Sequence, residues 1–378
     1  MEDQFSFMDL DLFEIAYNGC FSVLNLALDH LDIYNFQVNS KDHLGNSLLH
    51  YAARKGNIEA TQKLLALSAS PDILDEKGST PLHLACIKKH IAVVRILLDH
   101  AAKIDIKNYF GYTPLSLAVR CGDEALVRYL IKKGADITAT NNVYESLLHI
   151  AVASRNEKLV ELFIRRGKLG VDSRNSCDET PLMMAVKYGI PSIVDMLLDY
   201  NVDHSIKDHN KRNLIHLAVY GNHLHICQIL IMKNVSVNEL DNEGRSPLHV
   251  AAEMNYVNLI KLLVKNGAKI NQQDLDGYTP LHVAASNIHS ADSVEVLLKL
   301  GAKRDWLTFS GELPFHRAAA SGNDKVLMSL YKKEFLQLKT KDGYSAKMFA
   351  IELEKISVLH LLENLEKAAN FRSSRQVK

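Results

Sequence analysis

The stretch "DGYTPLHVAA", residues 276–285, contains the features that decide the fold of this chain. Thr279 is a good helix N-cap, because its hydroxyl accepts a hydrogen bond from an otherwise unpaired backbone N–H. Pro280 follows at the first helical position, where its missing N–H costs nothing. Ala284 and Ala285 are small enough to let a neighbouring helix approach closely. The stretch therefore predicts a short helix that packs tightly against others.

The same pattern recurs along the chain at intervals of 32 to 34 residues. The positions that match Thr279 are Ser47, Thr80, Thr113, Ser146, Thr180, Asn213, Ser246, Leu313 and Ser345. After each predicted short helix comes a turn, often Gly-Asn as at Gly56–Asn57, and then a segment with apolar residues at helical spacing. An Asp and a Gly lead through a tight turn to the next cap. This periodicity predicts stacked structural repeats.

The TPLH core, the 33-residue period and the repeat ends "GADI" and "GAKIN" resemble the ankyrin-repeat family over residues 8–367. The resemblance implies an all-α repeat solenoid with short β-hairpin loops, in which about ten repeats follow a degenerate one and neighbours bury one another. We expect the following division of the chain. It comprises an N-terminal segment (1–9), a degenerate capping repeat (10–40), ankyrin repeats (41–340), a C-terminal capping repeat (341–367) and a disordered basic tail (368–378).

Composition and charge narrow the class of protein. Basic and acidic residues number 44 each, so the formal net charge is zero and no overall excess indicates nucleic acid. The acidic start "MEDQFSFMDLDLFE" is unlike a secretory signal, and no apolar stretch predicts a membrane span. The five cysteines form no CxxC pair, as expected of reduced thiols. We expect a soluble, monomeric protein of the cytoplasm or the nucleus.

One histidine recurs at the fourth place of the core motif. The seven members of this set are His50, His83, His149, His216, His249, His282 and His316. An active site needs a unique set of groups, whereas a residue that recurs once per repeat indicates a structural role. The resemblance implies that this histidine binds the cap hydroxyl and ties each repeat to its neighbour.

Other histidines come close together in a single repeat and raise the possibility of a metal site. They are His204, His209, His223 and His225, beside His216. His223 and His225 are two residues apart on an expected helix and so point to different faces, and no cysteine or carboxylate completes a ligand set. Motifs of nucleotide-binding loops, serine hydrolases and zinc proteases do not occur. We predict no metal, no cofactor and no enzyme activity, and an enzyme with a cryptic site is the least favoured alternative.

Two sets of residues are candidates for binding a protein partner. Basic residues recur at equivalent inner-helix positions and would form a stripe on the concave face, suited to an acidic peptide or helix. The stripe comprises Arg54, Lys55, Lys88, Arg120, Arg155 and Lys187. Aromatic residues at two predicted hairpin tips, Tyr109 with Phe110 and Trp306 with Phe309, are candidate anchors. A solvated face, or packing between adjacent tips, is the alternative interpretation of these features.

The predicted function is that of a non-catalytic scaffold or adaptor that binds another protein through its inner-helix face and hairpin tips. A secreted bacterial effector that engages a host protein in the host cytosol is the alternative, because the glutamate-rich C-terminal helix and its polar tail resemble type IV secretion tails.

Three consecutive tips also carry Tyr144, Asp178 and Lys211 where other repeats have glycine. If that position has a positive φ, each side chain there lowers the stability of the folded protein by about 1 kcal/mol.

Overall fold

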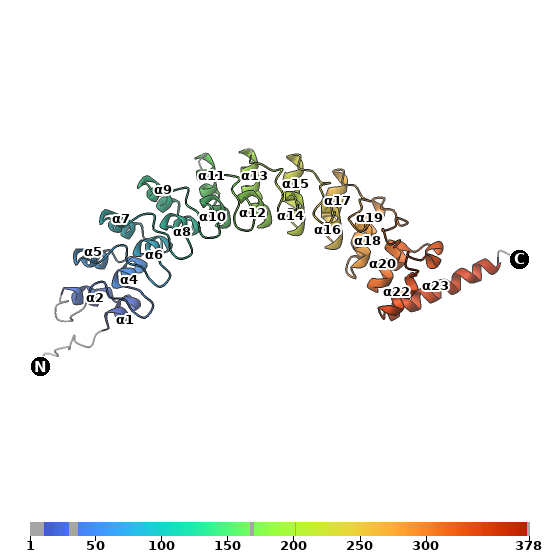
Figure 1. Cartoon of the computed structure of the whole chain (residues 1–378), viewed down its shortest axis with the longest axis horizontal. Coiled ribbons are helices and arrows are strands. Elements are labelled where there is room, and N and C mark those ends of the chain that lie inside the picture. Colours follow the sequence, from blue (N-terminus) through green and yellow to red (C-terminus); the bar gives the residue numbers. More distant parts are fainter. Residues whose placement is uncertain (1–10, 30–36, 167–169, 201, 376–378) are drawn as a thin grey trace. The chain divides into compact units, whose positions relative to one another are not determined.

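The computed structural model describes residues 11–29, 37–166, 170–200 and 202–375 of the 378-residue chain, with side chains described as far as Ala369. The chain separates into two compact units, Met1–Met184 and Ala185–Lys378, here called unit 1 and unit 2. Both units are built from pairs of short helices that follow one another along the chain (Figure 1).

The first helix of each pair, here the inner helix, begins directly after a cap residue. The inner helices are α4 (Leu48–Lys55), α6 (Pro81–Ile87), α8 (Pro114–Arg120), α10 (Leu147–Ala153), α12 (Pro181–Lys187), α14 (Leu214–Tyr220), α16 (Pro247–Glu253), α18 (Pro280–Ser286), α20 (Pro314–Ser321) and α22 (Ala346–Glu352). Helix α12 contains the boundary between the two units.

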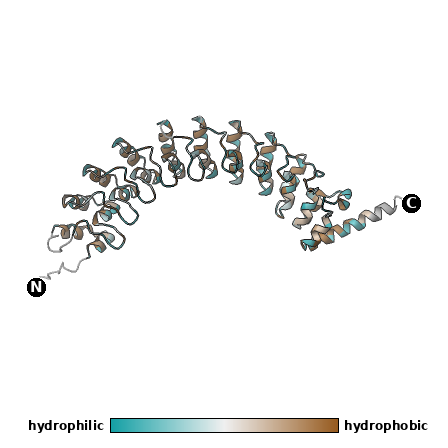
Figure 2. Cartoon of the chain, in the orientation of Figure 1, coloured by the Kyte–Doolittle hydropathy of each residue, from teal (hydrophilic) through white to brown (hydrophobic). Residues whose placement is uncertain are grey.

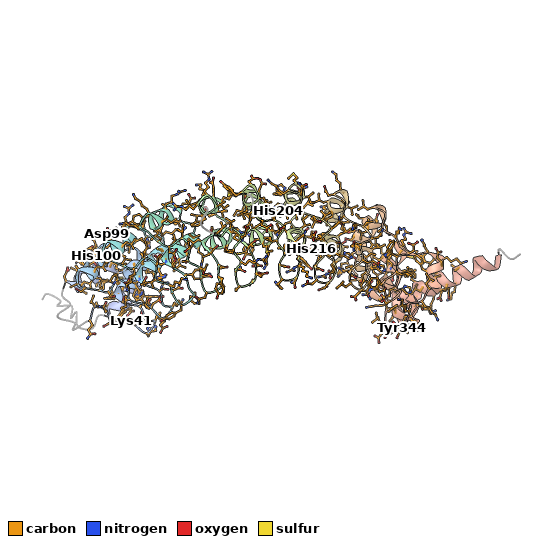
Figure 3. All side chains as sticks on the ribbon, turned by 45° about the horizontal axis from the view of Figure 1, so that its top comes forward. Lys41, Asp99, His100, His204, His216 and Tyr344 are labelled. Carbon is orange, nitrogen blue, oxygen red and sulfur yellow. The ribbon has the colours of Figure 1, made fainter. Side chains whose placement is uncertain are left out.

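The second helix of each pair is here the outer helix. The outer helices are α5 (Ile58–Ala66), α7 (Ile91–Asp99), α9 (Glu124–Lys132), α11 (Glu157–Arg165), α13 (Pro191–Asp199), α15 (Leu224–Met232), α17 (Val257–Lys265), α19 (Ala291–Lys299), α21 (Asp324–Leu330) and α23 (Ile356–Arg375). A 3₁₀ helix, η2 (Lys333–Gln337), follows α21. Figure 3 shows Asp99 and His100, at the end of α7, away from Lys41 in unit 1.

The inner helices begin as their sequence predicts. In α6 the Thr80 hydroxyl lies 3.4 Å from the backbone nitrogen of His83, and Pro81 occupies the first helical position. Seven or eight residues are too few for a helix to be stable alone in water, so packing must hold these helices in place. The side chains of Leu82 and Leu97 are fully buried in unit 1, as are those of Leu248 and Leu263 in unit 2.

Like helices pack on like helices within each unit. In unit 1, α4 contacts α6, α6 contacts α8, and α5 contacts α7. In unit 2, α16 contacts α18, α18 contacts α20, and α17 contacts α19. Hydrophobic residues concentrate in the helices, whereas the connecting turns are more hydrophilic (Figure 2). The core of each unit is therefore a series of thin layers between successive repeats, and not one central cluster.

The loops between repeats are tight turns, without strands in the ranges that the structure describes; one isolated bridge joins Lys339 to Ser345. In the turn before α6, the N–H of Gly78 donates to the carbonyl of Asp75 over 3.0 Å. Gly78 has a φ of 70°, and a Cβ atom there would lie 2.5 Å from the ring of Tyr109 in the next turn. Glycine is thus needed for its backbone conformation and for the close stacking of turns.

Three turns hold a larger side chain in the same left-handed conformation. The φ angles are 58° at Tyr144, 61° at Asp178 and 57° at Lys211. All three positions therefore have the positive φ at which a side chain lowers stability. We assign a loss of about 1 kcal/mol to Tyr144 and a smaller loss to Asp178, because a short polar side chain tolerates this region better.

The two ends of the chain differ from the central repeats. At the beginning, α1 (Leu12–Asn18) and α2 (Phe21–Leu28) are joined at Gly19, whose φ is 81°. At the other end, α23 continues as far as Arg375 and so enters the segment expected as a tail, residues 368–378. Residues 376–378 and the expected segment 1–9 lie outside the described residues. Among the described residues, no helix combines the length and apolar character needed to cross a membrane.

Candidate functional site

The recurring histidines share one pair of contacts. In α4 the Nδ1 atom of His50 accepts a hydrogen bond from the backbone N–H of the cap residue, Ser47, over 3.1 Å. On the other side of the ring, Nε2 lies 3.0 Å from the carbonyl oxygen of Ser79 in the next repeat. The same bridge recurs at the other six positions, with Nε2 to carbonyl distances of 3.0 or 3.1 Å. Each histidine therefore connects two repeats.

These contacts fix the protonation state of the ring. A backbone N–H can only donate, so Nδ1 carries no proton, and a carbonyl can only accept, so Nε2 carries one. The imidazole is therefore neutral, and burial lowers the pKa of all seven histidines, to about 4 for both His249 and His282. A group held neutral between two backbone partners supports the fold and has no free atom for chemistry.

The histidines considered as metal ligands do not gather. His216, labelled in Figure 3, belongs to the buried bridge in unit 2, where Nε2 lies 3.0 Å from the carbonyl of Arg245. His223 lies 3.2 Å from the carbonyl of Lys187 through its own Nε2. Across the described part of the chain, no three histidine, cysteine or carboxylate side chains are grouped as a metal would require.

A groove of about 720 Å³ runs along unit 1 between the inner helices and the turns. It is lined by three of the predicted stripe residues, Arg54 of α4, Lys88 after α6 and Arg120 of α8, together with the tip residue Phe110. All three cationic side chains are exposed. The groove therefore brings cations from three successive repeats together with an aromatic ring.

The cations of this groove are not neutralised by neighbours. In the residues that the structure describes, no carboxylate lies within 4.0 Å of the side-chain nitrogens of Arg54, Lys88 or Arg120. Arg120 instead lies over the ring of Tyr112, with 5.4 Å between the guanidinium carbon and the ring centroid. Asp75, Glu76 and Lys77 also line the groove, and Asp75 accepts hydrogen bonds from its own turn. The unpaired cations outnumber the acids that remain available.

Two arginines close to inner helices of unit 2 have a different environment. Arg245 forms ion pairs with Asp241 at 3.3 Å, Glu243 at 3.1 Å and Glu253 at 3.6 Å. Arg317 pairs with Glu312 at 3.5 Å. Charges that are satisfied internally have less to gain from a ligand, because a new ion pair would replace an existing one. The groove of unit 1 is therefore the stronger candidate for binding an anion.

The remaining stripe residues do not line this groove. Lys55 lines an adjoining hollow with Arg54 and Lys88. Arg155 is exposed beyond the end of α10 with a φ of 56°, and Lys187 belongs to unit 2. The structure thus brings together three of the six predicted basic residues in one groove.

The aromatic tip residues are partly packed and partly free. The ring of Tyr109 covers Gly78 of the preceding turn, yet 65% of the residue is exposed. Phe110 is 57% exposed and lines the groove. One face of this tip therefore packs against the preceding turn, while its exposed face leaves the binding of a partner as a prediction.

The second aromatic pair lies in unit 2. Phe309 packs over Gly277 of the preceding turn and is 57% exposed. Trp306 is half-buried, and the ammonium of Lys303 lies 4.9 Å from its ring centroid. Neither residue lines any of the five hollows described in the two units.

Sequence reasoning missed several groove residues. Leu84 and Leu117 line its floor and occupy the same place in two repeats, directly after the fourth residue of the core motif. Placing all residues at equivalent repeat positions on the inner-helix face, and not the basic residues alone, would have identified them. Tyr112, which supports Arg120, was missed because its role depends on a contact between a turn and the end of a helix.

Comparison with known families agrees with this architecture. Models described as "Ankyrin repeats (3 copies)" match residues 12–108, 49–141, 139–208 and 200–274, and one described as "Ankyrin repeats (many copies)" matches residues 263–318. No curated protein matches the chain. The matches cover most of the sequence and coincide with helix pairs in both units, and the chain accordingly belongs to the ankyrin-repeat family, a module of protein–protein interaction.

Proposed function

We propose that the protein is a non-catalytic scaffold or adaptor whose unit 1 groove binds an acidic segment of another protein. The observation that carries the proposal is the set of three unpaired cations, Arg54, Lys88 and Arg120, on one groove beside Phe110. Preorganised positive charge raises the association rate of an anionic partner, and an adjacent aromatic ring gives apolar contact area. Free cysteines, two of them buried, fit a reducing compartment such as the cytoplasm.

The ligand chemistry follows from the groove. Its cations come from three successive repeats, in or directly after the inner helices, and neighbouring helices pack about 8–10 Å apart, so the charges are spread over about 20 Å. An extended peptide of six residues covers about the same length. We therefore expect a peptide or helix with several carboxylates and at least one apolar side chain placed to contact Phe110.

The test measures a defined peptide with the full chain. The probe is a fluorescein-labelled twelve-residue peptide rich in Glu with one Phe, beside the same peptide with Gln for Glu. The groove variant is R54E/K88E/R120E, and the matched control is K103E/R128E/K132E, which reverses three exposed charges of unit 1 outside the groove.

Fluorescence anisotropy should show the acidic peptide bound by the wild type and by the control, with an affinity at least tenfold weaker for the groove variant. The affinity should also fall as salt is added, because exposed charges are screened over about 8–10 Å. Equal affinities of the groove variant and the control variant would reject the groove as the binding site.

The effector alternative concerns where the protein acts and not what the groove binds. A translocation assay on the full chain and on a chain without its last twenty residues separates a secreted effector from a scaffold of the protein's own cell, since only an effector requires that segment for export.

A further inference from the structure

Two further hollows in unit 1 connect the groove to the beginning of the described chain. One, of about 620 Å³, is lined by Asp11, Phe13, Tyr17 and Tyr51, and it shares Leu44 with the groove. The other, of about 550 Å³, is lined by Tyr17 and Tyr51 and shares Arg54 and Lys88 with the groove. These shared residues make one continuous path from Asp11 to the cations.

The chemistry changes along this path. Its first part combines aromatic and apolar side chains with acidic ones: Tyr17 and Leu44 are 56% and 46% exposed, and the rings of Tyr17 and Tyr51 meet edge to face at 6.1 Å. Asp11, Glu14 and Asp42 also line it, beside Lys41 and His43. Its second part is cationic, with Arg54 and Lys88 lacking carboxylate partners among the described residues. A segment that fills the path needs apolar side chains close to Asp11 and acidic side chains farther from it.

Residues 1–10, "MEDQFSFMDL", have this order of side chains and join the path at Asp11. Phe5, Phe7 and Met8 are the nearer apolar residues, and Glu2 and Asp3 are the farther acids. The sequence has no lysine or arginine before Lys41, so nothing basic in the segment would repel the groove. These residues lie outside the described part of the chain.

We propose that residues 1–10 bind the path and compete within the same molecule for the groove, so that an acidic partner must displace them. The proposal rests on the proposed function, because it assigns an internal occupant to the same cations. Glu2 and Asp3 pair with Arg54 and Lys88, and the phenylalanines cover Tyr17 and Leu44.

The segment is long enough for this contact. Packed helices lie about 8–10 Å apart, so the steps from α1 to α4 and on to α6 cover about 16–20 Å. Eight or nine extended residues reach about 26–32 Å, which brings Glu2 and Asp3 to Lys88. A short tether gives the segment an effective concentration in the millimolar range. If its own dissociation constant is about 100 µM, it weakens the binding of an external acidic peptide about tenfold.

The first measurement compares the acidic test peptide on three full-length proteins. They are the wild type, the variant E2Q/D3N/D9N, and the control D292N/E334Q/D342N, which removes the same charge from exposed positions of unit 2. The neutralised segment should give about tenfold tighter binding than the wild type, whereas the control should not differ from it. Equal affinities of all three proteins, with groove dependence intact, would overturn this inference and leave the proposed function standing.

The second measurement does not depend on the test peptide. A carbodiimide joins a carboxylate directly to a lysine that it contacts, and an equal mixture of ¹⁴N and ¹⁵N protein distinguishes links within a chain from links between chains. We expect a Glu2–Lys88 or Asp3–Lys88 link within one chain that the K88R variant lacks. Absence of this link, or its formation only between chains, contradicts the inference. Loss of peptide binding from every protein while the link persists would instead reject the external partner and retain the internal contact.

Discussion

Mild acid provides a quantitative test of the histidine bridges in unit 2. The folded-state pKa of His249 is about 4, whereas an imidazole in the unfolded chain titrates near 6.5. Between these values the unfolded chain binds more protons than the folded chain, so stability falls as pH falls. The neutral ring contributes fully above pH 6.5, and its contribution disappears as pH approaches 4.

The expected size of the effect follows from the two pKa values. Lowering the pH from 7.5 to 5.0 should cost about 2 kcal/mol of unfolding free energy for His249, and about the same for His282, whose pKa is also about 4. The other five histidines of the set contribute in the same direction, because burial lowers their pKa as well.

The matched variant is H249S, because the chain already has serine at the same place in α8. There the hydroxyl of Ser116 donates to the carbonyl of Thr113 over 2.8 Å. At pH 7.5 the variant should lose about 1–2 kcal/mol with the inter-repeat hydrogen bonds. At pH 5.0 its deficit against the wild type should shrink by about 2 kcal/mol, because it has no proton to gain.

Hydrogen exchange of the backbone amides in α16, corrected for the intrinsic rate at each pH, reports this local opening free energy. A local measurement is preferable since a repeat array need not unfold in one step. If the wild type and H249S lose the same stability between pH 7.5 and 5.0, the assignment of a neutral, bridging His249 is wrong.

Three other predictions concern the turns and the thiols. Gly267 and Gly277 have similar φ angles, 86° and 85°, but only at Gly277 would an added Cβ meet a backbone atom, at 2.6 Å. In urea unfolding, G267A should therefore lower the free energy of unfolding by about 1 kcal/mol, and G277A by clearly more. Y144G should raise stability by about 1 kcal/mol, since glycine removes the penalty of a φ of 58°, and an unchanged or lower melting temperature would argue against strain there. Iodoacetamide should label exposed Cys177 in the native protein but leave Cys227, whose pKa burial raises to about 12, until urea is added; equal labelling rates would contradict its burial.

The family and the periodic parts of the structure could be predicted from the sequence. Thr80 and Pro81 specify the start of α6 through local rules of capping and backbone geometry, which need no knowledge of distant residues. The recurrence of histidine at the fourth place of the core motif predicts a structural role, and the contacts of His83 with its cap residue and with the next repeat agree with it. Periodic residues are predictable because every repeat supplies the same neighbours.

The candidate site was predictable only in part. Arg54, Lys88 and Arg120 were identified by their equivalent repeat positions, but Lys187 shares that position and lies in the other unit. The bounds of α23, which ends at Arg375 inside the segment expected as a tail, were not predicted from the sequence. Helix α23 packs against α21, α22 and η2, and such contacts between separate elements are not encoded in a local pattern.

The repeat, its caps and its buried histidine positions can be read from the amino-acid sequence, because these depend on interactions within one repeat and with equivalent neighbours. Which charges lack partners became evident only from the folded chain. Arg245 and Arg120 are both arginines near an inner helix, yet one is surrounded by three carboxylates and the other faces a tyrosine and an open groove. Side chains from different turns and helices set that electrostatic environment, and their meeting in space is a property of the stacked repeats.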